Sequence, residues 1–325
     1  MKLKAWAALL VALAAHAALA QERGSAESYP AKPIRFIVPY APGGPTDILA
    51  RLIGQKLAER WGQQVLVDNR AGANGVIGAE LAARSPGDGH TLFLGNTSIL
   101  TINPSLYARL PYDAEKDFAP VNLTVAAPLV LVVHPSMAVK SVAELVKLAK
   151  ARPGQITFAS SGSAGVAHLS GELLKYLTKI DMVHIPYKGT ALAVTDVLSG
   201  QVSLTFSSAV SVMPHVKAGK LRGLGATTPK RAPSLPELPS IAESVPGYDV
   251  SPWYGVLVPA GTPRGVVTKL HEEIARIVSA RDVAQRLTGD GGSIVSAGPE
   301  EFAKVIRQER AKWAKVITAA NIKLD

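Results

Sequence analysis

A buried strand, a turn rich in proline and glycine, and an amphipathic helix follow one another directly in residues 34–61 of this 325-residue chain. The apolar run IRFIV predicts a strand, and the turn PYAPGGP ends it because proline and glycine interrupt regular structure. Pro45 suits the first helical position, where its missing N–H would have no partner in any case. Leucine and isoleucine then recur at helical spacing. We therefore predict a strand over 34–38 and a helix over 45–61.

This turn has the chemical properties of an anion-binding site. Gly43 and Gly44 lack a Cβ, so a ligand can approach the main chain closely. The N–H groups at the start of a helix have no partner within it, and the helix dipole adds partial positive charge there. Thr46 and Asp47 place side-chain acceptors in the same first turn. Asp47 is interpreted either as a helix-start acceptor or as a ligand contact.

A second stretch, residues 156–178, repeats this plan. Its sequence predicts a strand over 156–159, the turn ASSGSAG and a helix over 164–177. Ser161 or Ser163 can cap this helix, and the small residues Gly162 and Ala164 leave its N–H groups accessible. A plain helix cap is the alternative interpretation. Two such turns at equivalent points of two sheets favour a clamp that holds an acidic solute in a cleft.

Strand and helix patterns alternate through both halves of the chain, which is typical of an α/β fold with its own sheet in each half, and the alternation over residues 34–94 predicts parallel pairing there. Ligands of such sheets bind beyond the carboxyl ends of the strands, so Asn96 and Thr97 are expected on the same rim as residues 40–47. Residues 101–127 look irregular, and the proline-rich segment 227–252 predicts a loop with a short helix. Further strands are expected at 65–67, 91–94, 129–133, 182–185, 202–206, 221–226 and 254–259, and further helices at 75–84, 141–151, 190–198, 210–218, 266–280 and 300–319.

Two apolar strands that each end at a proline, LVVHP and YGVLVP, indicate where the chain changes domain. We expect it to cross to a second domain near the first of these strands and to return near the second. The predicted limits are a signal peptide over 1–20, a first domain formed by 21–127 and 250–325, and a second domain over 128–249.

The first twenty residues have the features of a signal peptide. Lys2 and Lys4 precede an apolar run that is short for a membrane span, and the tripeptide ALA before Gln21 fits signal peptidase. We therefore predict export to the periplasm with cleavage after Ala20. The chain has no cysteine, which excludes disulfides, thiolate metal sites and a lipid anchor on cysteine.

The net charge of +10 either favours anionic ligands in general or reflects only a solvated basic surface. The basic residues are scattered and only 6% of the residues are aromatic, so nucleic acid is not expected as a partner. Lys188 is either a solvated loop residue or a positive charge near the cleft. The motifs GxSxG, HExxH, CxxC and the P-loop are absent, and the glycines of NRAGANGVIG do not have dinucleotide-binding spacing. We predict no catalytic residue, no metal and no cofactor.

Five ordered motifs resemble the Bug family, the periplasmic solute-binding proteins of tripartite tricarboxylate transporters. The resemblance implies a type II periplasmic-binding fold, with two α/β domains and a ligand cleft between them. It also implies a carboxylate ligand gripped between the two turns, partly through ordered waters, and transporter membrane subunits as partners. The motifs are YPAKPIRFIVPYAPGGPTD, NRAGANGVIGAELAARSPGDGHTLFLGN, ASSGSAGVAHLSGELL, VHIPYKGTALAVTDVLSGQVSLTF and KAGKLRGLGATTPKR.

The resemblance carries over to individual residues. His168 is expected to pack or to line the cleft, and the same two alternatives hold for Tyr187. Ser207 and Ser208 stand where the family often has an acidic residue or asparagine, which favours a plain organic acid over an amino acid. The matching positions of the two turns are Tyr40, Pro42, Gly43, Gly44, Thr46, Asp47, Ser160, Ser161, Gly162, Ser163 and Ala164.

The sequence thus predicts a monomeric binding protein that captures a small di- or tricarboxylate, or another organic acid, and delivers it to a transporter. Two alternatives use the same fold. The protein either presents its solute to a signalling receptor or acts as an enzyme.

Overall fold

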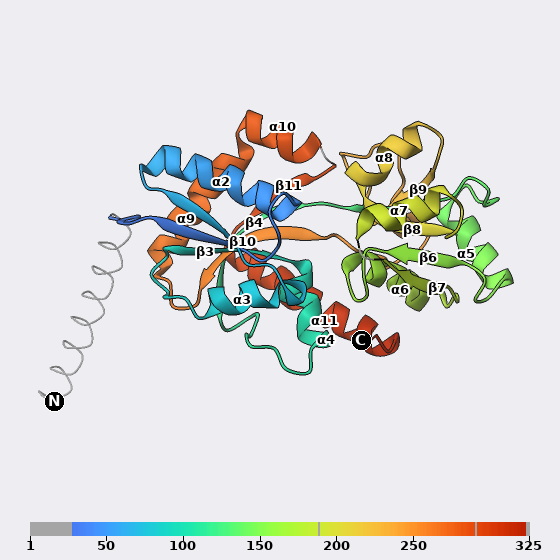
Figure 1. Cartoon of the computed structure of the whole chain (residues 1–325), viewed down its shortest axis with the longest axis horizontal. Helices are drawn as coiled ribbons and strands as arrows, with labels where there is room; N and C mark the ends of the chain where they lie inside the picture. Colours follow the sequence, from blue (N-terminus) through green and yellow to red (C-terminus); the bar gives the residue numbers. More distant parts are fainter. Residues whose placement is uncertain (1–27, 188, 290, 323–325) are drawn as a thin grey trace, which may run out of the picture.

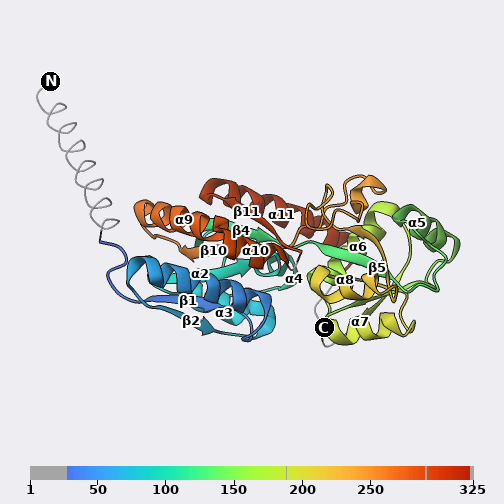
Figure 2. The same cartoon turned by 90° about the horizontal axis from the view of Figure 1, so that it is seen from above.

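The computed structural model describes residues 28–187, 189–289 and 291–322. The predicted signal peptide, its cleavage point after Ala20 and Lys188 lie outside these residues. Within them, no helix combines the length and the apolar character that a bilayer span requires. Figures 1 and 2 show two lobes side by side along the long axis of the molecule, each built on one β-sheet.

The first lobe contains a six-stranded sheet in the order β11-β4-β10-β3-β1-β2. β1 pairs in parallel with β2 and β3, whereas β10 runs antiparallel to β3 and β4. The parallel pairing predicted for the strands within residues 34–96 is therefore confirmed, and the later strands make the sheet mixed. Its strands are β1 (Ile34–Val38), β2 (Val65–Asn69), β3 (Thr91–Asn96), β4 (Phe118–Ala126), β10 (Trp253–Pro259) and β11 (Ser293–Ala297).

Helices cover both faces of this sheet. One face packs its buried side chains against α2 and α9, and the other packs against α3 and the start of α11. The sequence explains this arrangement, because Phe36 and Ile37 are neighbours in β1 and so point to opposite faces. The helices of this lobe are α2 (Pro45–Trp61), η1 (Ala73–Gly75), α3 (Val76–Ala83), the π-helix η2 (Ser98–Ile102), α4 (Asn103–Leu106), α9 (Arg264–Ser279), α10 (Arg281–Gly289) and α11 (Pro299–Ala319).

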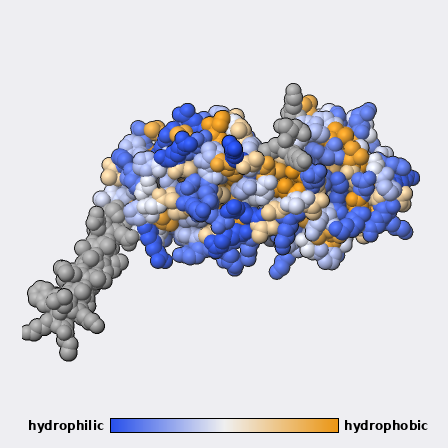
Figure 3. Space-filling view, turned by 90° about the horizontal axis from the view of Figure 1, so that it is seen from below, coloured by the Kyte–Doolittle hydropathy of each residue, from blue (hydrophilic) through white to orange (hydrophobic). Residues whose placement is uncertain are grey.

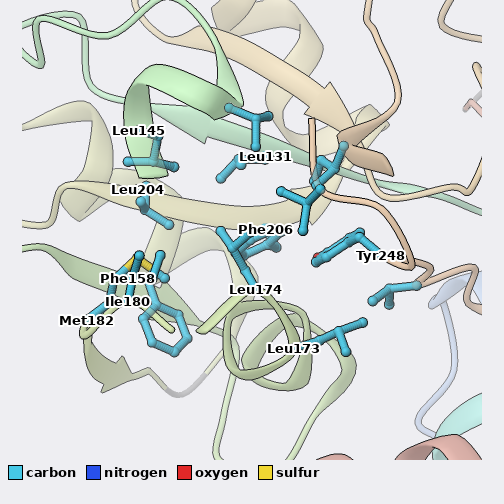
Figure 4. Close-up of a cluster of buried hydrophobic side chains, with 14 of the residues drawn as sticks. Leu131, Leu145, Phe158, Leu173, Leu174, Ile180, Met182, Leu204, Phe206 and Tyr248 are labelled. Atoms are coloured by element: carbon cyan, nitrogen blue, oxygen red, sulfur yellow. The ribbon is translucent and has the colours of Figure 1, made fainter. Parts of the chain in front are cut away.

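The second lobe has a five-stranded mixed sheet in the order β7-β6-β8-β5-β9. Helices α5 and α6 pack on one face, where Phe158, Leu174 and Phe206 form the apolar cluster of Figure 4. Helices α7 and α8 cover the other face. The elements are β5 (Leu129–Val133), α5 (Val142–Ala151), β6 (Thr157–Ser160), α6 (Val166–Thr178), β7 (Val183–Pro186), α7 (Thr190–Leu198), β8 (Leu204–Ser208), α8 (Ala209–Lys217), β9 (Arg222–Ala226) and η3 (Ile241–Glu243).

The chain passes from the first sheet to the second between β4 and β5 and returns between β9 and β10. The two crossings touch, because Ala127 N–H donates to the carbonyl oxygen of Pro252 at 2.8 Å. The end of α11 adds a third link, since Trp313 and Ile317 belong to the apolar core of the second lobe. The two sheets agree with a two-domain fold, and the limits 21–127, 128–249 and 250–325 remain a proposal.

Several local predictions were wrong. Residues 101–127 are not irregular, because they contain part of η2, α4 and the nine-residue strand β4. α10 and β11 were missed altogether. α6 begins at Val166, two residues later than predicted, with Gly165 as its N-cap and no side-chain cap, so neither Ser161 nor Ser163 caps it.

Candidate ligand site between the lobes

A cavity of about 340 Å³ lies between the two lobes, and we call it the interlobe cavity. Among the described residues that line it, none carries a charge. The first lobe and the crossings contribute Pro45, Asn74, Asn96, Thr97, Ser98, Ala127, Pro252, Trp253 and Tyr254. The second lobe contributes Leu129, Ser161, Gly165, Val166, Ala167, Thr190, Ala193, Thr205, Phe206, Ser207 and Ser208.

Four helices begin at this cavity. Pro45 and Thr190 are the first residues of α2 and α7, Gly165 is the N-cap of α6, and Ser208 is the N-cap of α8. None of the four N-caps makes a side-chain cap hydrogen bond. Helix starts have unpaired N–H groups and partial positive charge, so the cavity has a positive potential although no described cation lines it.

The first turn is held in place by Asp47, which is buried. Its Oδ2 accepts from Gly43 N–H and from Arg51 Nε, both at 2.9 Å, and its Oδ1 accepts from Asn69 Nδ2 at 3.0 Å. The hydrogen bond from Arg51 is the main reason that the pKa of Asp47 lies below its ordinary value. Its two oxygens are thus occupied within the protein, which fits the helix-start interpretation of this residue.

The rim beside this turn is joined to β3, as the sequence predicted. Asn96 Nδ2 donates to the hydroxyl of Tyr40 at 3.1 Å. Burial raises the pKa of Tyr40 to about 12, so this phenol stays neutral and can also donate. A second cavity of about 450 Å³ shares Pro45, Asn96 and Tyr254 with the interlobe cavity. Its other lining residues are Tyr40, Ala41, Pro42, Gly44 and Thr46.

The second turn is held by two histidines. Ser160 Oγ lies 2.7 Å from His184 Nε2 and donates to the carbonyl oxygen of Gly162 at 2.8 Å. At the other end of the turn, Ala164 N–H donates to His168 Nδ1 at 2.9 Å. Ala164 has a φ of 60°, a left-handed conformation that is uncommon for residues other than glycine. The bond from its N–H therefore stabilises a backbone shape that the sequence alone does not favour.

The predicted site residues fall into two groups. Eight line the interlobe cavity or the adjoining one, and eight line neither. The lining group is Tyr40, Pro42, Gly44, Thr46, Asn96, Thr97, Ser161 and Ser207, with Pro45 between them as a residue the site prediction omitted. The others are Gly43, Asp47, Ser160, Gly162, Ser163, Ala164, His168 and Tyr187, and Tyr187 donates its hydroxyl to Asp196 at 2.6 Å.

Several lining residues escaped prediction, chiefly Thr190, Thr205, Trp253 and Tyr254. Thr190 could have been predicted from the sequence as a site residue, because it starts a helix that follows a strand and a glycine. Two buried polar atoms of the lining have no hydrogen-bond partner among the described residues, namely Ser207 Oγ and Trp253 Nε1. No group of three or more His, Asp or Glu side chains in the described part of the chain is arranged to hold a metal ion.

Comparisons with known proteins agree with the two-lobed fold. The family model of the tripartite tricarboxylate transporter family receptor, TctC, matches residues 49–322. The protein BugT of Bordetella pertussis is 37% identical over 302 residues, which are 92% of this chain and 93% of BugT. The solved structure of R. palustris Rpa4515 with adipate has a TM-score of 0.78 and 36% identity, and the match covers 91% of this chain and 99% of that one.

MatC (Rpa3494) from Rhodopseudomonas palustris with bound malate is also similar. It has a TM-score of 0.74 and 31% identity, over 89% of this chain and all of the other. Both structures therefore share the two-lobed fold over nearly the whole described chain. From the family match and these similarities, the chain belongs to the tripartite tricarboxylate transporter receptor family, the family of TctC and the Bug proteins.

Proposed function

We propose that this protein captures a small carboxylate between its lobes and delivers it to a tripartite tricarboxylate transporter. The observation that carries the proposal is the convergence of four helix starts on a cavity with no charged side chain among its described lining residues. A carboxylate accepts hydrogen bonds from such N–H groups, and each bond to a charged group contributes about 1.5–3 kcal/mol net.

The size and chemistry of the cavity narrow the ligand class. A volume of about 340 Å³ is at the lower end of the range for small-molecule sites, which is roughly 300–1,000 Å³. Serine, threonine and asparagine side chains supply polar contacts, whereas Phe206, Leu129 and Val166 supply apolar ones. This mixture suits a short aliphatic acid.

The cavity is also unsuited to an ammonium group. A buried cation needs an acidic partner, and none of the described lining residues is acidic. Ser207 and Ser208 occupy the positions at which the sequence led us to expect discrimination against amino acids. We infer that the ligand is an organic acid without a positive charge. The adipate and malate in the titles of the related structures belong to this class.

The cellular setting is part of the same proposal. The predicted signal peptide and the family of periplasmic receptors support export to the periplasm. Release of the ligand to the membrane subunits of a transporter requires the lobes to separate. The crossings at Ala127 and Pro252, which meet at the cavity, are the natural place for that hinge.

Mass spectrometry of small molecules released from the denatured protein tests the proposal without assuming a ligand. Calorimetry then compares matched pairs, namely adipate with uncharged adipamide and succinate with aspartate, which is succinate bearing an ammonium group. We expect adipate and succinate to bind at least tenfold more tightly than their partners. Equal affinity within each pair would contradict the proposal, as would the absence of binding to any organic acid.

A further inference from the structure

We propose that His168 and His184 are positioning residues for the second turn, residues 160–165, and that this turn keeps its ligand-binding shape only while the imidazole of His168 is neutral. The inference rests on the proposed function, because Ser161 and Gly165 of this turn line the interlobe cavity. Neither histidine lines that cavity. They act on the ligand through the turn that they hold.

The hydrogen bonds fix the tautomer of each ring. Ser160 has one hydroxyl proton and donates it to Gly162 O, so His184 Nε2 must carry a proton and donate to Ser160 Oγ. Gly162 N–H also donates to Ser160 Oγ at 3.3 Å. His184 thereby anchors the hydroxyl that closes the first half of the turn.

His168 holds the second half of the turn as a hydrogen-bond acceptor, whereas His184 acts as a donor. Its Nδ1 accepts from Ala164 N–H at 2.9 Å, so this nitrogen has no proton and Nε2 carries the one proton of the neutral ring. Nε2 lies 3.7 Å from Glu172 Oε1, on the next turn of α6. A second proton on His168 would have to go to Nδ1, where it would meet the N–H of Ala164 and remove its acceptor.

The two rings lie in direct contact. Their centroids are 3.6 Å apart and their planes differ by 5°, which is a stacked arrangement. Phe158 packs against both, with ring centroids 5.0 Å from His184 and 6.0 Å from His168. A charge on one imidazole therefore lies against an apolar ring and disfavours a charge on the other.

The charged groups that face the pair come from α6. Glu172 is buried and pairs with Lys175 at 2.9 Å, so the negative charge beside His168 is already balanced by a lysine. β6, which packs against β7, carries no ionisable side chain in Thr157–Ser160. Burial first and His168 second lower the pKa of His184 to about 4, which agrees with a neutral His184 at pH 7.

The consequence is a turn that responds to acid. As the pH falls, protonation of His168 breaks the bond to Ala164 and leaves that residue in a left-handed conformation without its stabilising contact. The N–H groups near Ser161 and Gly165 then lose their fixed directions. Ligand affinity falls in acid for a reason that is separate from protonation of the ligand itself.

The test measures affinity for one carboxylate between pH 7.5 and 4.5 in the wild type, His168→Asn and His184→Gln. Asparagine and glutamine keep a hydrogen-bonding atom at the place of Nδ1 and Nε2, respectively, but do not titrate. We expect affinities within about threefold of the wild type at pH 7.5. At pH 5, the wild type should have lost about tenfold more affinity than His168→Asn. The ligand's own titration is common to all three proteins and cancels in this comparison.

The control variant is His215→Gln, which removes a histidine in the last turn of α8. It should follow the wild-type curve. Parallel pH curves for the wild type, His168→Asn and His184→Gln would overturn the inference.

A second measurement needs no ligand and so separates failure of this inference from failure of the proposed function. Nuclear magnetic resonance of the imidazole nitrogens should show neutral rings at pH 7, with His168 protonated at Nε2. The amide proton of Ala164 should exchange faster with solvent as the pair titrates, after correction for the intrinsic pH dependence of exchange. Charged rings at pH 7, or an Ala164 amide that does not respond, would refute the inference whatever the protein binds.

Discussion

The two turns that border the cavity have the same task but are held by different chemistry. The first turn is fixed by an ionised carboxylate, because Asp47 accepts from Gly43 N–H and is paired with Arg51. The second turn is fixed by neutral imidazoles, which contact Ser160 and Ala164. The pKa of Asp47 is lowered, chiefly by the hydrogen bond from Arg51, so the first turn keeps its acceptor in acid, whereas the bond from Ala164 N–H requires an imidazole nitrogen without a proton. The equivalent turns of the two lobes thus differ in how they respond to pH.

The region where the lobes meet differs from the surface around it (Figure 3). Hydrophilic side chains cover most of the face in Figure 3, and hydrophobic ones gather where the lobes meet. The cavity itself has no charged side chain among its described lining residues. Anion binding here depends on main-chain groups, so changes that alter charge inside the cavity should have larger effects than changes to the turns that support it.

The largest effect is expected from a negative charge on the second turn. Ser161→Asp places a carboxylate in the cavity, where repulsion between like charges about 4 Å apart is worth roughly 4 kcal/mol at an effective dielectric of 20. Affinity for a dicarboxylate should fall by at least about 100-fold in calorimetry. Ser161→Asn, the uncharged variant of similar size, should lose much less. Similar losses of affinity in both variants would show that side-chain shape at residue 161, rather than its charge, controls ligand binding.

Removal of the carboxylate from the first turn should have the next largest effect. Asp47→Ala leaves Gly43 N–H without its acceptor and removes one of the two acceptors of Asn69 Nδ2, which costs about 2–3 kcal/mol in the free energy of unfolding. Chemical denaturation measures this loss. Asp88→Ala provides the control, because Asp88 pairs with Lys32 on the surface and should cost less than about 1 kcal/mol. If the two variants were equally stable, Asp47 would not be holding the turn.

A smaller effect separates the two glycines of the first turn. Gly43 has a φ of 86°, so alanine there should cost about 1–2 kcal/mol in stability although nothing obstructs its Cβ. Gly44 has ordinary extended angles, φ −81° and ψ 172°, and its Cβ would also have room. Gly44→Ala should therefore leave the thermal midpoint almost unchanged. A larger loss for Gly44→Ala than for Gly43→Ala would contradict this view of the turn.

The smallest predicted effect is on the pH dependence of stability. The pKa of His184 is lowered to about 4, so the unfolded chain binds the extra proton first and stability falls as the pH drops from about 6.5 toward 4. His184→Gln should remove this contribution of His184 to the pH dependence of the free energy of unfolding. Its stability relative to the wild type should rise by about 1 kcal/mol between pH 7 and pH 5, measured by urea denaturation. Asp47 has a lowered pKa, so its contribution to stability is present in full above its ordinary value of 3.8 and is lost only as the pH falls below that value.

Sequence reasoning captured the parts of the fold in which local pattern and structure agree. The strand and helix of residues 34–61 have the predicted limits, because an apolar run, a proline and a helical repeat all point the same way. β4 was missed because Pro120 and Asn122 are poor strand residues. Their places in the strand depend on the neighbouring β10 and on the hydrogen bond from Asn122 to His271.

The site was predicted only where its residues lie on one of the two turns. The contribution of Trp253 comes from the return crossing, which is distant in the sequence and shows no motif of its own. The roles of His168 and His184 depend on a ring stack between α6 and β7, and no spacing along the chain reveals such a contact. Long-range packing therefore determined both of these features.

A crystal structure of the protein with its carboxylate ligand tests the central claim most directly. The account predicts carboxylate oxygens within hydrogen-bond distance of main-chain N–H groups from both turns, at residues 43–47 and 161–167. A ligand held by lysine or arginine side chains, or bound outside the interlobe cavity, would contradict it.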